Sequence, residues 1–179
     1  DTNRVGTIAG SLIGSAALSK TGAGTIAITG NATGYTGTVT VEQGTLRLAS
    51  ALGNGGAGNV IVNDLATISG KGSVANSLTL GTIAGANLSV SAQTAGALAT
   101  KDLTVNGLNT VRLTDTPLVP GTPINLITYS GALTMTGAVE DHFQLLNAAT
   151  FRTLPVFANP ANAITLTVSA GADLVWRGE

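Results

Sequence analysis

Residues 20–53 read KTGAGTIAITGNATGYTGTVTVEQGTLRLASALG and contain three short β-type runs separated by turns. The runs 24–28 and 44–48 share one pattern, Gly-Thr followed by an apolar, a variable and an apolar residue, which begins at Gly24 and again at Gly44. The third run, 39–41, lies between them. A pattern that returns at this interval indicates that the chain revisits the same face once per coil.

The pattern continues in weaker form along the chain. Apolar residues equivalent to Ile26 and Leu46 follow at Ile68, Leu88 and Val111, each preceded by Thr or Asn. Apolar side chains that recur once per coil point to the same side of the backbone. We therefore expect Ile26, Leu46, Ile68, Leu88 and Val111 to form one inward stack.

A second series of apolar pairs alternates with the first at a similar mean step of about 21 residues. An ordinary sandwich has no fixed sequence period, whereas a solenoid climbs one strand spacing, about 4.8 Å, per coil. Two interleaved series therefore predict a parallel β-helix with coils of about 21 residues. The pairs are Val39 and Val41, Val60 and Val62, Leu78 and Leu80, Leu103 and Val105, and Ile124 and Leu126.

The composition agrees with a thin all-β core. Of the 179 residues, 44% are hydrophobic but only 3% aromatic, and 24 are glycines. Small aliphatic side chains and many turn-competent residues favour short strands over a helical bundle. We expect a single β-solenoid unit over 1–179, with corners at Asn54-Gly55 and at 70–72, regular coils over 1–115, and irregular coils with a cap or junction over 116–179.

Residues 1–23 allow two interpretations. A helix over 11–20 is one, but Gly6, Gly10 and Gly14 each disfavour helix by roughly 1 kcal/mol relative to Ala. Strands are favoured, because the step from Ile8 to Ile28 is the same as the step from Gly24 to Gly44.

The C-terminal third has a different composition. Three of the five prolines lie at 117, 120 and 123, which predicts a loop or an edge crossing. All three phenylalanines and the only histidine follow residue 139, and this bulk predicts a cap over the last coil. A helix over 141–151 is the alternative, and 164–168 reads as a strand.

Charge and cysteine content limit the partners and the kinds of site that the chain can have. A net charge of −1 with scattered Lys and Arg gives no field that would recruit nucleic acid or an anionic membrane. The absence of cysteine excludes disulfides and thiolate metal sites, and fits a secreted bacterial chain. No apolar run reaches about 18 residues, so no membrane insertion is expected. The start at Asp1 suggests a processed or excised piece.

Residues 20–48 resemble the autotransporter-associated β-strand repeat of large secreted bacterial passenger proteins. Gly34, before Tyr35, departs from the usual family pattern. The resemblance implies a right-handed parallel β-helix at the cell surface or in a released fibre, with no catalytic residues. The matching residues are Lys20-Thr21-Gly22, Gly24-Thr25-Ile26, Ile28, Gly30-Asn31, Tyr35-Thr36-Gly37, Val39, Val41 and Gly44-Thr45-Leu46-Arg47-Leu48.

The end of the chain carries a second resemblance. Residues 174–179, LVWRGE, are similar to the Leu-x-Trp-x-Gly run that often opens a new unit in such proteins. Trp176 is therefore the expected junction between consecutive units.

The β-helix is also a fold of polysaccharide-cleaving enzymes, so the carboxylates need weighing. Glu42 and Asp64 are separated by close to one coil and could stack about 5 Å apart, as in a retaining glycosidase. Asp102 lies further along the chain. Without basic, aromatic or histidine support, solvated turn residues are the favoured interpretation.

Two other motifs carry little chemistry. His142 follows Glu140 and Asp141, but no second His or Cys exists to complete a metal site, and a hydrogen-bonded cap histidine is favoured. Residues 53–58, GNGGAG, lack the Lys-Ser/Thr of a phosphate loop and are expected to be a corner.

Together these features predict a non-enzymatic structural segment of an extracellular or cell-surface bacterial fibre or adhesin, without cofactor or metal. Its expected partners are neighbouring copies or units stacked end to end, and possibly a surface glycan or protein. One rival is an adhesin head that binds its receptor through loops at 117–123 or 154–160. The other is a polysaccharide-degrading enzyme centred on Glu42 and Asp64.

Overall fold

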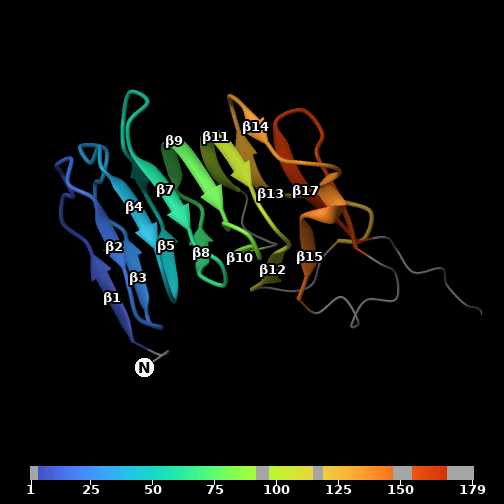
Figure 1. Ribbon diagram of the computed structural model, residues 1–179, viewed down its shortest axis with the longest axis horizontal. Helices are drawn as coiled ribbons and strands as arrows, with labels where there is room; N and C mark the ends of the chain where they lie inside the picture. Colours follow the sequence, from blue (N-terminus) through green and yellow to red (C-terminus); the bar gives the residue numbers. More distant parts are fainter. Residues whose placement is uncertain (1–3, 92–96, 115–118, 147–154, 169–179) are drawn as a thin grey trace, which may run out of the picture.

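The computed structural model describes residues 4–91, 97–114, 119–146 and 155–168. Over these residues the chain is a β-solenoid in which successive coils add strands alternately to two sheets (Figure 1). All neighbours in the seven-stranded sheet are parallel. Its order is β1 (Val5–Ile8), β3 (Thr25–Ile28), β5 (Thr45–Leu48), β8 (Thr67–Gly70), β10 (Asn87–Val90), β12 (Asn109–Leu113) and β15 (Phe143–Leu145).

The ten-stranded sheet is parallel except at its C-terminal end, where β17 pairs antiparallel with both β13 and β16. Two short strands lie off the main path, β6 (Ala51–Leu52) beside β9 and β14 (Leu133–Thr134) beside β11. The main path is β16 (Val156–Ala158), β17 (Ala163–Thr167), β13 (Ile124–Tyr129), β11 (Leu98–Val105), β9 (Ser73–Leu80), β7 (Asn59–Val62), β4 (Thr38–Val41) and β2 (Leu18–Lys20).

The five apolar residues of the first series are register partners on consecutive strands of the seven-stranded sheet. Ile26 pairs with Leu46, Leu46 with Ile68, Ile68 with Leu88, and Leu88 with Val111. The last four are at most 1% exposed, whereas Ile26 is only half-buried. The reason lies one coil earlier, because the partner of Ile26 there is a glycine, Gly6, which has no side chain to cover it.

The second series follows the prediction over four coils and then departs from it. Val39, Val60, Leu78 and Leu103 are successive register partners, as are Val41, Val62, Leu80 and Val105. The expected continuation at Ile124 and Leu126 is wrong. Leu103 instead pairs with Leu133, and β13 pairs with the first half of β11, where Leu98 faces Ile127.

The cause of this departure is the length of β11. This eight-residue strand has a register shift between Thr100 and Asp102, and its two halves have different partners on the next coil. Its first half takes β13 and its second half takes β14. One turn of chain therefore supplies two short strands to β11, as an earlier turn supplies β6 and β7 to β9.

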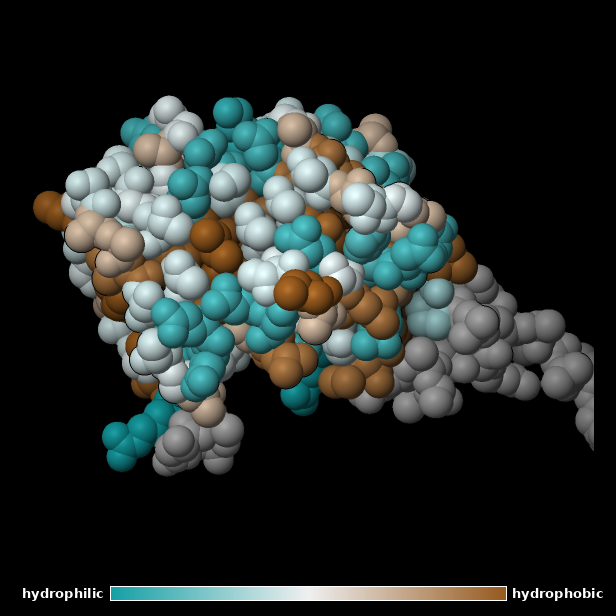
Figure 2. Space-filling view, viewed as in Figure 1, coloured by the Kyte–Doolittle hydropathy of each residue, from teal (hydrophilic) through white to brown (hydrophobic). Residues whose placement is uncertain are grey.

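The N-terminal residues form strands, as expected, and the helix over 11–20 is wrong. Ile8 pairs with Ile28, and Leu18 with Val39. Among the described strands, β1 and β2 each have one sheet neighbour, so this end of the solenoid is open. Val5 is 65% and Ile13 75% exposed here, and hydrophobic side chains protrude at the left end in Figure 2, over the first coil.

The edge strands at the C-terminal end, β15 and β16, also have one sheet neighbour each among the described strands, but they carry aromatic bulk. The ring centroids of Phe143 on β15 and Phe157 on β16 are 5.8 Å apart, so the edge strands of the two sheets meet through stacked aromatic side chains. The helical alternative is wrong for its described part, since η1 (Val139–Asp141) is one 3-10 turn that leads directly into β15. Residue 151 and the neighbouring 147–150 lie outside the described residues. The strand expected at 164–168 is β17.

Both predicted corners are present. Residues 54–56 turn the chain between β6 and β7, and 70–72 lead from β8 into β9. Gly70 has φ +98°, and a Cβ there would lie 2.0 Å from the carbonyl oxygen of Leu48. The corner therefore requires glycine, because the backbones of successive coils approach each other too closely for a side chain.

Candidate functional site

Asp64, one half of the predicted carboxylate pair, is fully engaged by the next coil. Its carboxylate accepts hydrogen bonds from the backbone N–H of Thr82 at 2.7 Å and from the Thr82 hydroxyl at 2.7 Å. The N–H groups of Ile83 and Gly85 also donate to it, at 3.1 Å each. These bonds, the Thr82 N–H first among them, hold the pKa of Asp64 well below its usual range. Such a carboxylate is a poor proton acceptor and acts as a clasp between coils.

Glu42 does not lie directly beneath Asp64. Val41 pairs with Val62, so Glu42 follows in register with Asn63, and the spacing that suggested a pair is one residue too long. The Glu42 side chain is exposed. Asp64 thus links two coils by hydrogen bonds, whereas Glu42 is a solvated side chain.

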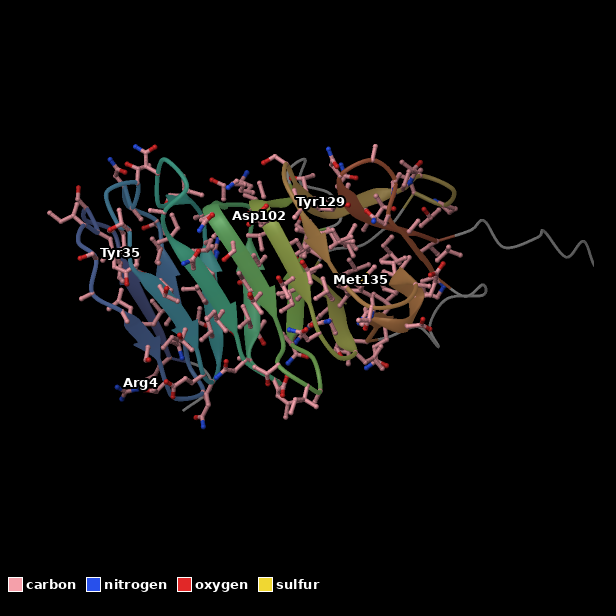
Figure 3. All side chains as sticks on the ribbon, turned by 45° about the horizontal axis from the view of Figure 1, so that its top comes forward. Arg4, Tyr35, Asp102, Tyr129 and Met135 are labelled. Carbon is pink, nitrogen blue, oxygen red and sulfur yellow. The ribbon has the colours of Figure 1, made fainter. Side chains whose placement is uncertain are left out.

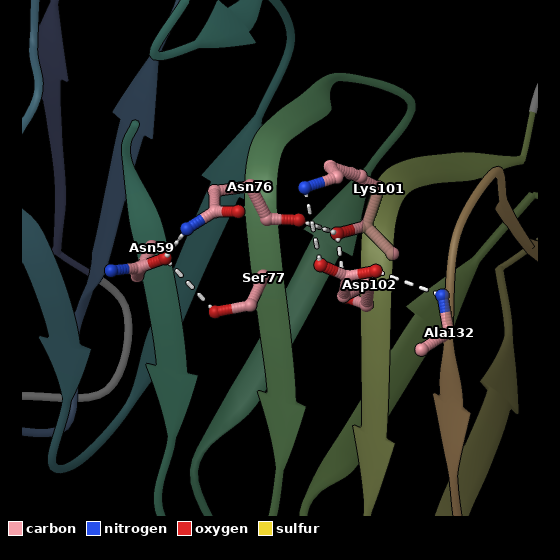
Figure 4. A network of polar contacts seen from close by, with 7 residues as sticks. Asn59, Asn76, Ser77, Lys101, Asp102 and Ala132 are labelled. Atoms are coloured by element: carbon pink, nitrogen blue, oxygen red, sulfur yellow. Dashed lines mark hydrogen bonds and ion pairs between the residues drawn. The ribbon is translucent and has the colours of Figure 1, made fainter. Parts of the chain in front are cut away.

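Asp102 lies further along the solenoid, on β11 (Figure 3). It accepts a 2.8 Å hydrogen bond from the N–H of Ala132, and its other oxygen is 3.6 Å from the Lys101 ammonium (Figure 4). Asp64 and Asp102 therefore bind different coils. Within the described part of the chain, no three His, Cys, Asp or Glu residues are grouped so that they could hold a metal ion.

His142 lies in the C-terminal region and is 8% exposed. Its Nδ1 is 2.9 Å from the carbonyl oxygen of Gly107, and its Nε2 contacts the carbonyl oxygen of Thr136. Asp141 accepts instead from the N–H of Ala138, at 3.2 Å. His142 is thus a buried histidine with both ring nitrogens against carbonyl oxygens, and it joins the Gly107 turn to the segment before β15.

Asn109 is a buried polar residue that the sequence interpretation missed. It is 0% exposed, and its Oδ1 accepts a 2.8 Å hydrogen bond from the N–H of Ala86 on the preceding coil. Its Nδ2 donates to the carbonyl oxygens of Asn106, at 3.1 Å, and of His142, at 3.2 Å. One side chain thus links three coils. The available signal was an Asn two residues before a stack position, at Asn109 and Val111.

The remaining sequence predictions concern loops and the chain end. The segment 53–58 is a corner, as expected. Residues 117–118 of the first predicted receptor loop, residue 154 of the second, and the expected junction Trp176 all lie outside the described residues. In the part of the chain that the structure describes, no helix is long and apolar enough to cross a membrane.

The outer face of the seven-stranded sheet contains two adjoining surface hollows. Residues between the stack positions point outward here, and register aligns Arg47, Ser69, Ser89 and Arg112 on four successive strands. A hollow of about 470 Å³ and a second of about 340 Å³ adjoin along this row, sharing Ser89 in their linings. The sequence signal was the repeated Thr-apolar-Arg-Leu of residues 45–48 and 110–113, which the search for catalytic groups passed over.

Comparison with protein-family models and with curated proteins gave no match.

Proposed function

We propose that this chain is a non-enzymatic structural segment of a secreted or cell-surface bacterial fibre or adhesin, a rigid stalk that extends by end-to-end stacking. The observation that carries the proposal is the open first coil. β1 and β2 end their sheets in parallel register with exposed apolar side chains at Val5, Ile13 and Leu18.

An open parallel edge favours addition of another coil of the same kind. Unpaired edge strands template pairing with further strands unless charge, proline or bulk protects them. The described residues of the first coil carry Arg4 and Lys20 as their charged residues and contain no proline. At the opposite end, Phe143 and Phe157 fill the space between the sheets. The two ends thus differ, so a stack of copies would be heterologous, with the first coil of one chain against the C-terminal end of the next.

The regular core supports the stalk role. Consecutive inward residues such as Leu46, Ile68 and Leu88 cover one another in register, so each coil is stabilised by its neighbours. The resemblance of residues 20–48 to the autotransporter-associated repeat supports a location outside the cell. The engagement of Asp64 by backbone N–H groups favours a scaffold over a glycoside hydrolase.

The test is a concentration series of the purified chain by sedimentation velocity, with electron microscopy of the concentrated sample. We expect association that grows with concentration and thin fibres with a regular axial repeat. Val5→Lys combined with Ile13→Lys should abolish it, because edge lysines oppose strand addition.

Ile83→Lys is the matched control, since Ile83 is 84% exposed but lies on a lateral corner. This variant should associate like the parent chain. A chain that stays monomeric at high concentration, or equal loss of association in the edge variant and the control, would contradict stacking through the first coil.

A further inference from the structure

The two adjoining hollows on the outer face of the seven-stranded sheet form one groove. The charge of this groove is unlike that of the whole chain. Arg47 and Lys71 line the larger hollow and Arg112 lines the smaller, and no acidic residue lines either one among the described residues. The chain carries a net charge of −1, yet this face presents three cations within two adjoining hollows. Such a local concentration of one sign attracts an anion even when the net charge is near zero.

The three cations of this groove differ from Lys20 and Lys101 in their contacts. The Lys20 ammonium donates to the carbonyl oxygens of Thr21, Gly22 and Gln43, and Lys101 lies beside Asp102. The described residues offer no hydrogen bond or ion pair to the side chains of Arg47, Lys71 and Arg112. All three side chains are exposed, and among the described residues their donors are unused.

The spacing of the row defines the shape of that ligand. Arg47 and Arg112 lie three strands apart, which is about 14 Å at the usual strand spacing. Between them the row dips to the small side chains of Ser69 and Ser89, and this dip is where the two hollows adjoin. An extended chain with anionic groups along its length can rest on the serines and reach both guanidinium groups.

We propose that this groove, centred on Arg47, Ser69, Ser89 and Arg112, binds a carboxylate-bearing polysaccharide. The planar guanidinium donates two parallel hydrogen bonds to a carboxylate. Around the arginines, both hollows offer hydroxyl or amide groups, which match the hydroxyls of a sugar chain. These polar lining residues are Thr45, Thr67, Ser69, Asn87, Ser89 and Thr110. Apolar surface beside them comes from Leu48, Ala49, Leu88 and Leu146.

The same lining argues against other polyanions. Single-stranded nucleic acid binding without sequence preference uses aromatic platforms for the bases, and neither hollow is lined by an aromatic residue among the described residues. An anionic membrane attracts basic clusters of about four to eight residues, more than the three cations here. Neither Glu42 nor Asp64 lines the groove, so the inference is one of binding and is independent of end-to-end stacking.

The test is affinity electrophoresis of the whole chain through gels containing polygalacturonate, with neutral dextran as the reference. We expect retardation by polygalacturonate, and roughly tenfold weaker apparent affinity after Arg47→Gln combined with Arg112→Gln, because two charge-assisted contacts are lost. Both side chains are exposed, so the variant should keep its circular dichroism spectrum and melting temperature.

Two pairs of variants separate a built groove from simple charge attraction. Lys101→Gln removes a cation from the other sheet and should leave retardation unchanged. Ser89→Leu fills the shared part of the groove at constant charge and should weaken retardation several-fold, whereas Thr79→Leu, at an outward position of β9, should not. Three outcomes would overturn the proposal. The first is no retardation of the parent chain, and the second is a loss of retardation in Lys101→Gln as large as that in the arginine double variant. The third is equal retardation by duplex DNA or dextran sulfate at matched charge.

Discussion

The phenol hydroxyl of Tyr35 donates a 2.6 Å hydrogen bond to the carbonyl oxygen of Ala16, which lies 19 residues earlier on the preceding coil. Tyr35 is 2% exposed, and burial raises the pKa of its phenol. A Cβ at position 37 would lie 2.7 Å from this hydroxyl, so a side chain there would clash with it and Gly37 avoids the clash. The Tyr-Thr-Gly motif therefore fastens the first coil, which is the open end of the solenoid.

Tyr35→Phe should remove this fastening while keeping the ring packed. We expect a loss of about 1 kcal/mol in the free energy of unfolding, the usual net value of one hydrogen bond. Hydrogen exchange should increase over residues 14–18 in particular. Tyr129→Phe is the control, because its hydroxyl bonds Asn159 near the other end (Figure 3). Equal exchange over 14–18 in both variants would argue against a local fastening.

Asp64 predicts a specific acid sensitivity. Its pKa is lowered in the folded chain, so its contribution to stability is complete above its unfolded value, near 4, and is lost as the pH falls through and below that value. Asp64→Asn turns an amide donor toward backbone donors and should lower the melting temperature at pH 7. The difference from the parent chain should shrink between pH 5 and pH 2.

The control for this pH effect is Glu42→Gln, since Glu42 is exposed. Urea unfolding followed by circular dichroism at pH 7, 5 and 3 should show parent-like stability for this variant. A difference between Asp64→Asn and the parent that stays constant over that pH range would show that the carboxylate charge does not matter.

The inward stack predicts graded costs of truncation. Ile68 is 0% exposed between Leu46 and Leu88, so Ile68→Ala should cost about 2–5 kcal/mol of unfolding free energy. Ile26→Ala removes the same atoms from a half-buried site next to Gly6 and should cost clearly less. Chemical denaturation of both variants measures the difference. Equal costs would mean that the first coil is packed as tightly as the middle ones.

The period and the main stack could be predicted because their information is local. Successive coils repeat a Thr-apolar or Asn-apolar step, and residues that share a step also share a face, so Leu46 and Ile68 could be paired without knowledge of distant contacts. The failure at Ile124 and Leu126 has the opposite cause. Their register depends on how the long strand β11 divides between two partners, and nothing within 124–126 encodes that division.

The candidate site was harder to predict for a related reason. Arg47 and Arg112 occupy the variable position of their repeats, where the two intervening coils carry serine, and they lie far apart in the sequence. Only the intervening register brings them onto one face. The pair suggested by spacing, Glu42 and Asp64, failed because coil lengths vary, and one extra residue displaces a side chain from its expected partner.

Asn109 should be the least replaceable polar residue of the core. Asn109→Leu keeps a similar volume but leaves the buried N–H of Ala86 without its acceptor, whereas the carbonyl oxygen of His142 still accepts from the backbone N–H of residue 109. An unsatisfied buried group costs about 1–3 kcal/mol, so the loss of unfolding free energy should exceed that of Tyr35→Phe. Thermal and urea unfolding measure this.

Asn87→Leu provides the comparison for Asn109→Leu, because Asn87 occupies the corresponding region of the preceding coil. The Asn87 amide donates a 2.7 Å hydrogen bond to the carbonyl oxygen of Leu65, and this bond is exposed to solvent. Water can replace that bond, so the cost should be within about 0.5 kcal/mol. If both variants lost the same free energy of unfolding, burial would not explain the stabilising effect of the Asn109 hydrogen bonds between coils.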